Sequence, residues 1–257
     1  MNVRARKQLG QHFLVDENIL GVIGRLADLQ QGDVVLEVGP GLGVLTRYLA
    51  ERVALVHAVE IDHRFEPHLQ IGPRARLHFG DALKLDLGAL RPPPVKLVAN
   101  LPYAIATPLV VESLDTYMTV DRWCVMVQRE VADRFFAGPG SKAYGAVSVL
   151  LQLATERTGF HPVSRTVFRP RPNVDSALVA FRRRPLPPSY PWIKRVIEAA
   201  FAHRRKTLPN SLALAGLSSR DAAEEGLAAI GREGSVRAEA LTPPEFVALA
   251  QALRSSQ

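Results

Sequence analysis

Residues 34–43 read Val-Val-Leu-Glu-Val-Gly-Pro-Gly-Leu-Gly, an apolar run that ends in a glycine-rich turn. The run predicts a buried strand over 34–38. Glycines let the backbone turn tightly and come close to a ligand. Their spacing here, at Gly39, Gly41 and Gly43, differs from the G-x-G-x-x-G pattern of dinucleotide-binding turns. The acidic Glu37 just before the turn favours a ligand with an ammonium group over one with a pyrophosphate.

Polar side chains follow three further predicted strands, over residues 54–59, 77–79 and 95–99. Glu60 comes about 20 residues after the glycine turn, where an acid can bind two ribose hydroxyls. Asp81 could accept a hydrogen bond from an adenine amino group. Because ligands bind at the carboxyl ends of the strands in open α/β sheets, these side chains predict one ligand site. A capping role in the local backbone is the alternative for Glu60 and for Asp81.

The segment Asn100-Leu101-Pro102-Tyr103 has the chemistry to act on the amino group of a flat base. Asn100 offers a side-chain oxygen that accepts one N–H. Pro102 biases Leu101 towards extended geometry, which could aim the Leu101 carbonyl at the second N–H. Tyr103 offers a face on which the base can stack. Two acceptors on an amino group draw its lone pair out of conjugation, so that the nitrogen can attack a methyl group. A strand followed by a polar turn is the alternative interpretation.

Strands that alternate with helices predict a mostly parallel, doubly wound sheet. We expect a helix capped by Asp16 and ended by Gly32, and another capped by Thr107 with Pro108 in its first turn. Further strands are expected over 122–128, 155–160 and 177–181, and helices over 130–136 and 146–153. Residues 168–176 contain too many prolines for regular structure.

The composition of the chain limits the classes of function that it can have. The net charge is +7 and the sequence pI is near 9.9, which indicates a polyanionic partner. The single Cys124 excludes an intrachain disulfide, fits a reducing compartment and is expected to be a buried thiol. The sequence has no membrane-length apolar run and no leader-like segment, so we expect a soluble cytoplasmic protein without membrane contact. The histidines show no metal-ligand spacing, and we predict no metal site.

Residues 182–210 hold eight basic groups against the single acid Glu198. This local excess of seven positive charges equals the net charge of the whole chain. The proline-rich segment 184–191 predicts a stiff linker, after which only helical patterns occur, near 192–202, 207, 220–230 and 244–253. We therefore predict two domains. Residues 1–184 form the first, with a basic N-terminal arm over 1–15, and residues 185–257 form a helical domain that binds nucleic acid. A solvated charged face is the alternative interpretation of the basic block.

Together, several stretches resemble the rRNA adenine N6-dimethyltransferases, and two of them resemble the KsgA branch of that family in particular. They are residues 11–14 (QHFL), 37–43 (EVGPGLG), 100–103 (NLPY) and 168–176 (FRPRPNVDS), and, for the KsgA branch, 201–208 (FAHRRKTL) and 237–246. The resemblance implies a Rossmann-like, seven-stranded domain that uses S-adenosylmethionine, followed by a small all-α domain. It also implies dimethylation of two adjacent adenosines near the 3′ end of small-subunit rRNA, on a pre-30S particle, by a protein that we expect to be monomeric and to serve ribosome biogenesis.

The resemblance also implies roles for single residues. The cofactor would contact His12, Leu14, Gly39, Gly41, Glu60, Asp81 and Asn100. Asn100 and the loop residues Leu101, Pro102 and Tyr103 would carry catalysis on a flipped adenine. Phe168, Arg204, Arg205 and Lys206 would contact the RNA. Three positions depart from the family pattern: His12 stands where Asn is usual, Ala104 follows the tyrosine where Asn is common, and Pro209 interrupts the basic motif.

Two alternatives are kept. One is a large-subunit rRNA adenine methyltransferase of the macrolide-resistance type, which shares the motifs of the first domain. The other is a ribosome-assembly factor that binds RNA and has weak or no methyltransferase activity, which the departures at His12 and Ala104 favour.

Overall fold

The chain forms two compact units. The structure is a computed structural model that describes residues 11–69 and 71–255. The first unit comprises residues up to 132 together with 156–183, and the second comprises residues 133–155 and those from 184 onwards. The second unit thus takes in residues 133–155 besides the C-terminal helices, which the linker at 184–191 did not predict. Most of the predicted basic arm, including Arg4, Arg6 and Lys7, lies outside the described residues.

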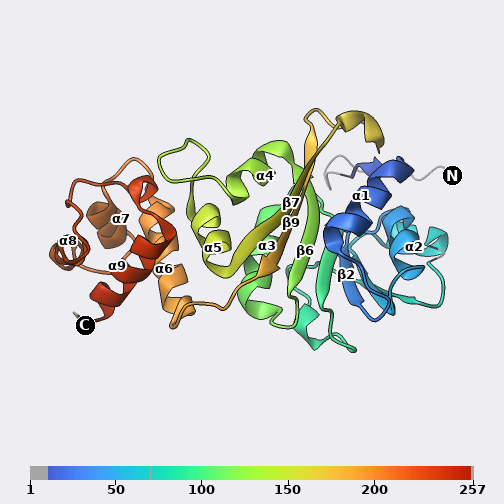
Figure 1. Ribbon diagram of the computed structural model, residues 1–257, viewed down its shortest axis with the longest axis horizontal. Coiled ribbons are helices and arrows are strands. Elements are labelled where there is room, and N and C mark those ends of the chain that lie inside the picture. The colour runs from blue at the N-terminus through green and yellow to red at the C-terminus, as the bar shows by residue number, and fades with distance from the viewer. Residues whose placement is uncertain (1–10, 70, 256–257) are drawn as a thin grey trace. The chain divides into compact units, whose positions relative to one another are not determined.

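Seven strands form one mixed sheet in the order β4-β3-β2-β5-β6-β9-β7 (Figure 1). Strands β4, β3, β2, β5 and β6 are parallel to their neighbours, whereas β9 is antiparallel to β6. The strand order reverses between β2 and β5, and a ligand crevice is expected beyond the carboxyl ends of the strands at such a point. The strands are β2 (Val34–Val38), β3 (Leu55–Glu60), β4 (Ala75–Phe79), β5 (Lys96–Asn100), β6 (Arg122–Gln128), β7 (Thr155–Val163) and β9 (Ser176–Arg183).

Helices cover both faces of the sheet. Helix α1 (Glu17–Ala27) packs on β5, β6 and β9, where Cys124 and Met126 belong to its apolar cluster. Side chains alternate along a strand, so Trp123 faces the other way, and its indole N–H donates to Ser113 of α3 (Ala106–Thr116) at 2.8 Å. The unit also contains α2 (Val44–Ala50), most of α4 (Arg129–Phe135) and the 3-10 turns at His63–His68, Leu87–Ala89 and Arg165–Val167.

A two-residue strand joins the N-terminal segment to the proline-rich segment. Strand β1 (Phe13–Leu14) pairs antiparallel with β8 (Phe168–Arg169). The side chains of Leu14 and Phe168 are buried in the α1 cluster. The prediction that residues 168–176 lack regular structure was therefore wrong for the first two residues, and also for Ser176, which begins β9. The error has a physical cause: the partner strand lies about 155 positions earlier in the chain, so no local pattern could indicate the pairing.

The second unit is helical over most of its length. Its helices are α5 (Ala146–Ala154), α6 (Tyr190–Ala202), α7 (Leu208–Leu214), α8 (Arg220–Ala229) and α9 (Pro243–Ser255), with a 3-10 turn at Ala238–Ala240. Pro209 lies in the first turn of α7, where its missing N–H costs nothing. At the start of α9, Thr242 and Glu245 form a reciprocal capping box.

Two predicted helix ends differ from the structure. Asp16 caps α1 as expected, but the helix stops at Ala27 because Asp28 adopts a left-handed conformation with φ of 49°, well before Gly32. Helix α3 begins at Ala106 after Ile105, so Thr107 lies inside the helix and is not its cap.

Cys124 is buried as expected, and burial raises the pKa of its thiol to about 12. Across residues 11–69 and 71–255, no helix is long and apolar enough to cross a membrane. Over the same ranges, no group of three or more His, Cys, Asp or Glu side chains could hold a metal ion.

Candidate active site

A pocket opens at the carboxyl ends of β2, β3, β4 and β5, at the expected crevice of the sheet. The β1 segment and the loop after β5 complete its wall. It gathers all of the residues that the resemblance nominates for cofactor and catalysis: His12, Leu14, Gly39, Gly41, Glu60, Asp81, Asn100, Leu101, Pro102 and Tyr103. Glu37 and Phe13 line it as well.

The glycine turn after β2 is fixed by what lies against it. Gly39 has φ of 78°, and a Cβ there would lie 3.0 Å from the Pro102 ring. Gly41 has φ of 54°, and a Cβ there would lie 3.0 Å from the Phe13 ring. Left-handed backbone and close approach both require glycine. The turn is therefore in contact with the loop after β5 on one side and with β1 on the other.

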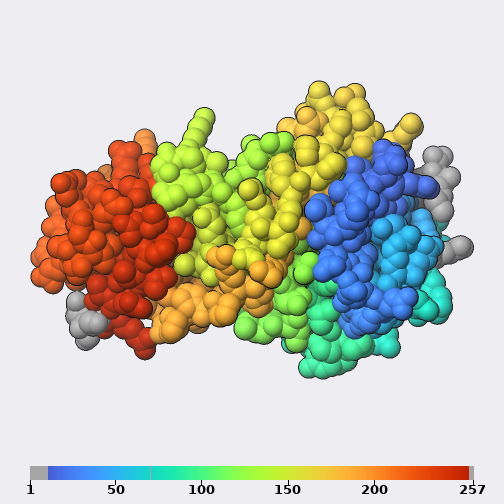
Figure 2. Space-filling view, in the orientation of Figure 1, coloured from blue at the N-terminus to red at the C-terminus, as the bar shows by residue number. Residues whose placement is uncertain are grey.

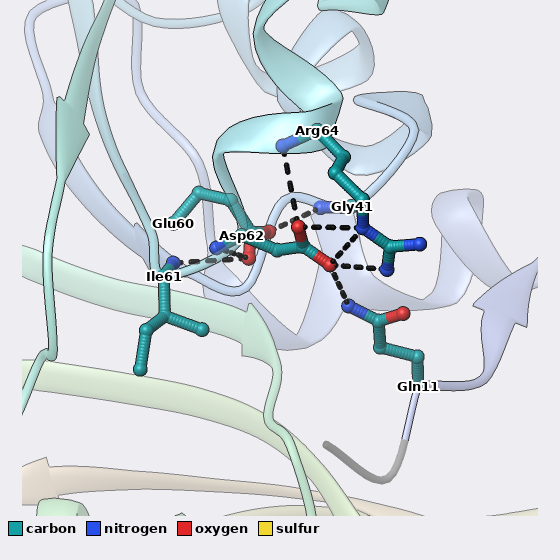
Figure 3. Close-up of polar contacts among 6 residues, drawn as sticks. All are labelled: Gln11, Gly41, Glu60, Ile61, Asp62 and Arg64. Carbon is teal, nitrogen blue, oxygen red and sulfur yellow. Dashed lines mark hydrogen bonds and ion pairs between the residues drawn. The ribbon is translucent and has the colours of Figure 1, made fainter. Parts of the chain in front are cut away.

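The Glu60 carboxylate organises the backbone around the end of β3 (Figure 3). Its Oε2 accepts a hydrogen bond from Gly41 N at 3.1 Å, and its Oε1 accepts from the backbone N–H groups of Ile61 and Asp62. Burial raises its pKa. A carboxylate has about four acceptor sites, and three are in use. The capping alternative is thus part of what Glu60 does, and about one acceptor position is left for a ligand.

Asp62 lies beside Glu60 and was not nominated by the sequence. Its buried carboxylate accepts hydrogen bonds from the Arg64 guanidinium and from Gln11 Nε2, the latter at 3.1 Å (Figure 3). These bonds, chiefly those from Arg64, hold the pKa of Asp62 well below its usual range. The network ties the N-terminal segment to the end of β3. Since Gln11 and Asp62 are 51 residues apart, no local signal could have found it.

Asp81 sits at the end of β4, on the pocket wall. One carboxylate oxygen accepts from Leu83 N at 3.0 Å, and the other lies 3.7 Å from the Lys84 ammonium. Its side chain is 30% exposed, so it keeps acceptor capacity towards the pocket.

Glu37 is a buried acid on the pocket wall. It is 1% exposed, and burial raises its pKa to about 8. Among the described residues, its Oε2 has no hydrogen-bond partner. A buried acceptor without a donor is costly. The oxygen fits a cationic donor brought in by a ligand, as the sequence before the glycine turn suggested.

Asn100 ends β5, and its side chain is oriented by the N-terminal segment. The Asn100 amide Nδ2 donates to the His12 carbonyl oxygen at 3.1 Å. The amide nitrogen is thereby engaged, and Oδ1 is left as the acceptor. Leu101, which follows, is buried, and its N–H donates to Met126 O of β6 at 3.1 Å. Asn100 and Leu101 are therefore held by the segment just before β1 and by strand β6, respectively.

Tyr103 is anchored at both its hydroxyl and its ring. The hydroxyl forms a 2.8 Å hydrogen bond with Ser176 Oγ at the start of β9, and burial raises the tyrosine pKa. The His12 ring lies 5.6 Å away, centroid to centroid, and His12 Nδ1 is 2.7 Å from the Pro170 carbonyl oxygen. The sequence did not nominate Ser176 for this task. The only signal was its place at the end of the stretch 168–176.

The predicted RNA-contacting residues do not line this pocket. Phe168 is 2% exposed and packs in the α1 cluster, so its ring faces the core instead of the pocket. Arg204, Arg205 and Lys206 are exposed in the turn between α6 and α7 of the second unit.

Comparison with known proteins gives the family. The family described as ribosomal RNA adenine dimethylase matches residues 2–239. The chain belongs to this family. It is 50% identical over 251 residues to ribosomal RNA small subunit methyltransferase A of Rubrobacter xylanophilus, a match that covers 96% of this chain and 94% of that protein. The chain is thus an rRNA-modifying methyltransferase that uses S-adenosylmethionine, as the resemblance implied.

Two solved structures share the fold. The dimethyladenosine transferase from Plasmodium falciparum has a TM-score of 0.75 at 22% identity, covering 93% of this chain and 96% of that one. The 23S rRNA methyltransferase ErmE has a TM-score of 0.66 at 27% identity, covering 94% and 99%. The predicted Rossmann-like sheet of seven strands followed by a helical C-terminal region is confirmed.

Proposed function

We propose that this protein transfers methyl groups from S-adenosylmethionine to the N6 amines of two adjacent adenosines near the 3′ end of small-subunit rRNA. The observation that carries the proposal is the orientation of Asn100. Its amide nitrogen is taken by the His12 carbonyl, so its oxygen is the group presented to a substrate amine.

Catalysis follows from hydrogen-bond geometry and needs no strong base. The Asn100 oxygen and the Leu101 carbonyl accept the two amine hydrogens, which localises the lone pair on N6. The cofactor supplies an electrophilic methyl group. As the new bond forms, the amine nitrogen becomes cationic and passes a proton to solvent. Tyr103, held by Ser176, stacks on the flipped base.

The cofactor would be held by groups on four strand ends. Asp81 accepts from the adenine amino group and Glu60 from a ribose hydroxyl, which agrees with the one acceptor position it has left. The unpartnered oxygen of Glu37 receives the ammonium group of the methionine end. Gly39 and Gly41 let that end approach the backbone. His12 and Leu14 cover the site from the N-terminal side, and Phe168 approaches the base only if β8 shifts.

The helical domain over 185–257 would bind the rRNA. Arg204, Arg205 and Lys206 support this, because all three are exposed and no hydrogen bond or ion pair holds their side chains within the described ranges. We further propose that the protein acts as a monomer on pre-30S particles in the cytoplasm, without membrane contact. The measurement that checks these points is co-sedimentation with small subunits together with the mass of the free protein in solution.

The test is methyl transfer to under-methylated small subunits, with large-subunit rRNA in parallel. We expect label on small-subunit adenines alone. Asn100→Ala should still bind the cofactor and lose about a thousandfold in methyl transfer, the scale of one preorganised acceptor. His12→Asn is the matched control, since its backbone carbonyl persists and Asn is usual there. Full activity of Asn100→Ala would refute the mechanism.

Two other functions make different predictions in the same assay. A large-subunit enzyme would label large-subunit rRNA. The ErmE structure shares the fold at 27% identity, which gives some support to a large-subunit substrate. The 50% identity with the small-subunit methyltransferase gives stronger support to a small-subunit substrate. An assembly factor with a silent site would bind small subunits tightly and incorporate no label.

A further inference from the structure

The first unit carries a second concavity that the proposed reaction does not use. It is a groove of about 890 Å³ between α1, the end of α2 and the segment that leads into β4. Figure 2 shows α1 in dark blue bordering α2 in lighter blue on the surface. No residue that lines the groove also lines the pocket at the strand ends.

The groove has an excess of positive charge. Arg25, Arg52 and Arg74 line it, against the single acid Glu51, so the lining carries a net charge of +2. All three arginines are exposed. Glu51 is engaged by Arg52 at 3.0 Å. The side chains of Arg25 and Arg74 form no hydrogen bond or ion pair with any described residue, so their charges are available to an anion.

One arginine is held rigidly in the groove wall. The Arg52 guanidinium carbon lies over the Tyr48 ring, 3.7 Å from its centroid, and the group donates to the Tyr48 carbonyl oxygen at 2.8 Å. Stacking fixes the plane of the guanidinium, and a planar fork with fixed orientation matches the oxygen pairs of a phosphate. The Arg52 side chain is therefore already ordered, and it loses little conformational entropy when a ligand binds.

Helix α1 contains two glycines at this groove, and these lower the stability of the helix. Gly21 and Gly24 both line it from within the helix, and a helical glycine costs about 1 kcal/mol relative to alanine. At Gly24 a Cβ would lie 2.3 Å from the Tyr48 hydroxyl, so only glycine lets Tyr48 lie against α1 and support Arg52. At Gly21 a Cβ would meet only the end of Arg25, at 3.7 Å, so packing against the fold does not require glycine there.

We propose that this groove binds the phosphate backbone of the rRNA substrate. The inference rests on the proposed function and extends it, since it gives the first unit its own RNA contact, apart from the basic turn of the second. Arginine forks take phosphate oxygens, and the exposed amide of Gln31 at one edge can donate to phosphate or to 2′-hydroxyl groups. The neighbouring Gln30 amide already donates to Asp28 and is not counted. Contacts of this kind set the register of the RNA and carry no sequence information.

The test uses the double variant Arg25→Gln/Arg74→Gln in the full chain. The probe is a protein-free 3′-terminal fragment of small-subunit rRNA, and its dissociation constant is measured over a range of salt. Each lost phosphate contact lowers the slope of log affinity against log salt by about 1. We expect weaker binding, a slope reduced by about 2, and an unchanged affinity for S-adenosylmethionine.

Two matched variants sharpen the result. Glu51→Gln removes the only acid from the groove lining and should tighten binding. Arg91→Gln removes one exposed charge outside the groove, from a side chain that bonds only the carbonyls of Gly88 and Leu90, and should leave affinity and slope unchanged. Thermal unfolding of each variant checks that the fold is intact.

Three outcomes would overturn the inference. An unchanged salt slope in the double variant is one, and an equal loss in Arg91→Gln is another. The third is weaker binding to assembled small subunits with normal binding to the RNA fragment, which would make the partner a protein. If the wild-type protein does not methylate small subunits at all, the proposed function itself fails, and that result is read separately from the binding slopes.

Discussion

At the scale of single residues, each polar side chain of the site already uses some of its polar atoms in hydrogen bonds within the protein and leaves another group for a ligand. Asn100 gives its nitrogen to His12 and keeps its oxygen, and Glu60 keeps about one acceptor position. Tyr103 gives its hydroxyl to Ser176 and keeps its ring face. Each group is thereby oriented before a ligand arrives, which is the preorganisation on which electrostatic catalysis depends.

Glu37 makes the stability of the ligand-free protein depend on pH. Burial raises its pKa from an ordinary 4.5 to about 8 in the folded protein, so the folded state binds more protons than the unfolded chain between those two pH values. Stability should therefore fall as pH rises through that window, with this group contributing roughly 1 kcal/mol per pH unit. Denaturant unfolding across the window measures it. Glu37→Gln should remove this part of the slope, and equal slopes in both proteins would exclude the effect.

Two substitutions at Tyr103 distinguish the contribution of base stacking from that of the hydrogen bond to Ser176. Tyr103→Phe keeps the ring and loses the bond to Ser176, so methyl transfer should fall only modestly. Tyr103→Ala loses the stacking face, which is worth about 1–3 kcal/mol per base. Single-turnover methyl transfer at subsaturating RNA measures both. Ser176→Ala should behave like Tyr103→Phe, and a severe loss in Ser176→Ala alone would assign the serine a further task.

At the scale of elements, α1 offers a matched pair of substitutions. Gly21→Ala meets no obstacle and should stabilise the protein by about 0.5–1 kcal/mol through helix propensity. Gly24→Ala gains the same propensity but drives Tyr48 away from the helix, and overpacking costs about 1–3 kcal/mol. We expect Gly24→Ala to be less stable than the wild type. Urea unfolding of both variants decides, and stabilisation by both would mean that Tyr48 moves freely.

Some features of the helices and strands could be predicted from the sequence, and others could not. The strand ends were predictable, because β2, β3 and β5 are mostly apolar runs that each stop at a polar residue or a glycine turn. Strand β4 contains Arg76 and His78, and its end was indicated by the following Gly80-Asp81. The cap of α3 was not, because the sequence Thr-Pro imitates a helix start just after the true one at Ala106. Asp62 and Ser176 were missed for another reason. The contacts that connect them to the site are with Gln11 and Tyr103, 51 and 73 residues away, and only the folded chain brings these pairs together.

At the scale of the whole molecule, the basic block over 182–210 has more than one task. Arg183 donates to the carbonyl oxygens of Leu114, Tyr117 and Val120, so it caps the end of α3 and faces no RNA. Arg182 is paired with Glu156. The excess charge read from the sequence therefore overstates what is free to meet an anion. The exposed turn with Arg204, Arg205 and Lys206 is the part of the block that fits the RNA-binding prediction.

We expect that turn to make RNA affinity steeply dependent on salt. Neutralising Arg204, Arg205 and Lys206 together, each to Gln, should lower the slope of log affinity against log salt by about 3. The loss should be similar for different RNA sequences, since phosphate contacts do not discriminate between bases. Fluorescence titration with small-subunit rRNA at several salt concentrations measures it. A slope that stays the same would move the RNA surface elsewhere on the molecule.

The anchoring of the loop after β5 has a consequence for biosynthesis. Its supports lie far away along the chain on both sides, because Asn100 contacts His12 across 88 positions and Tyr103 contacts Ser176 across 73. A ribosome that has just released the glycine turn and the end of β5 has made strands β2, β3, β4 and β5, yet the hydrogen-bond partner of the tyrosine hydroxyl, Ser176, is still missing. We expect a nascent chain that stalls before residue 176 to lack the hydrogen bond that orients Tyr103, and therefore to modify RNA poorly.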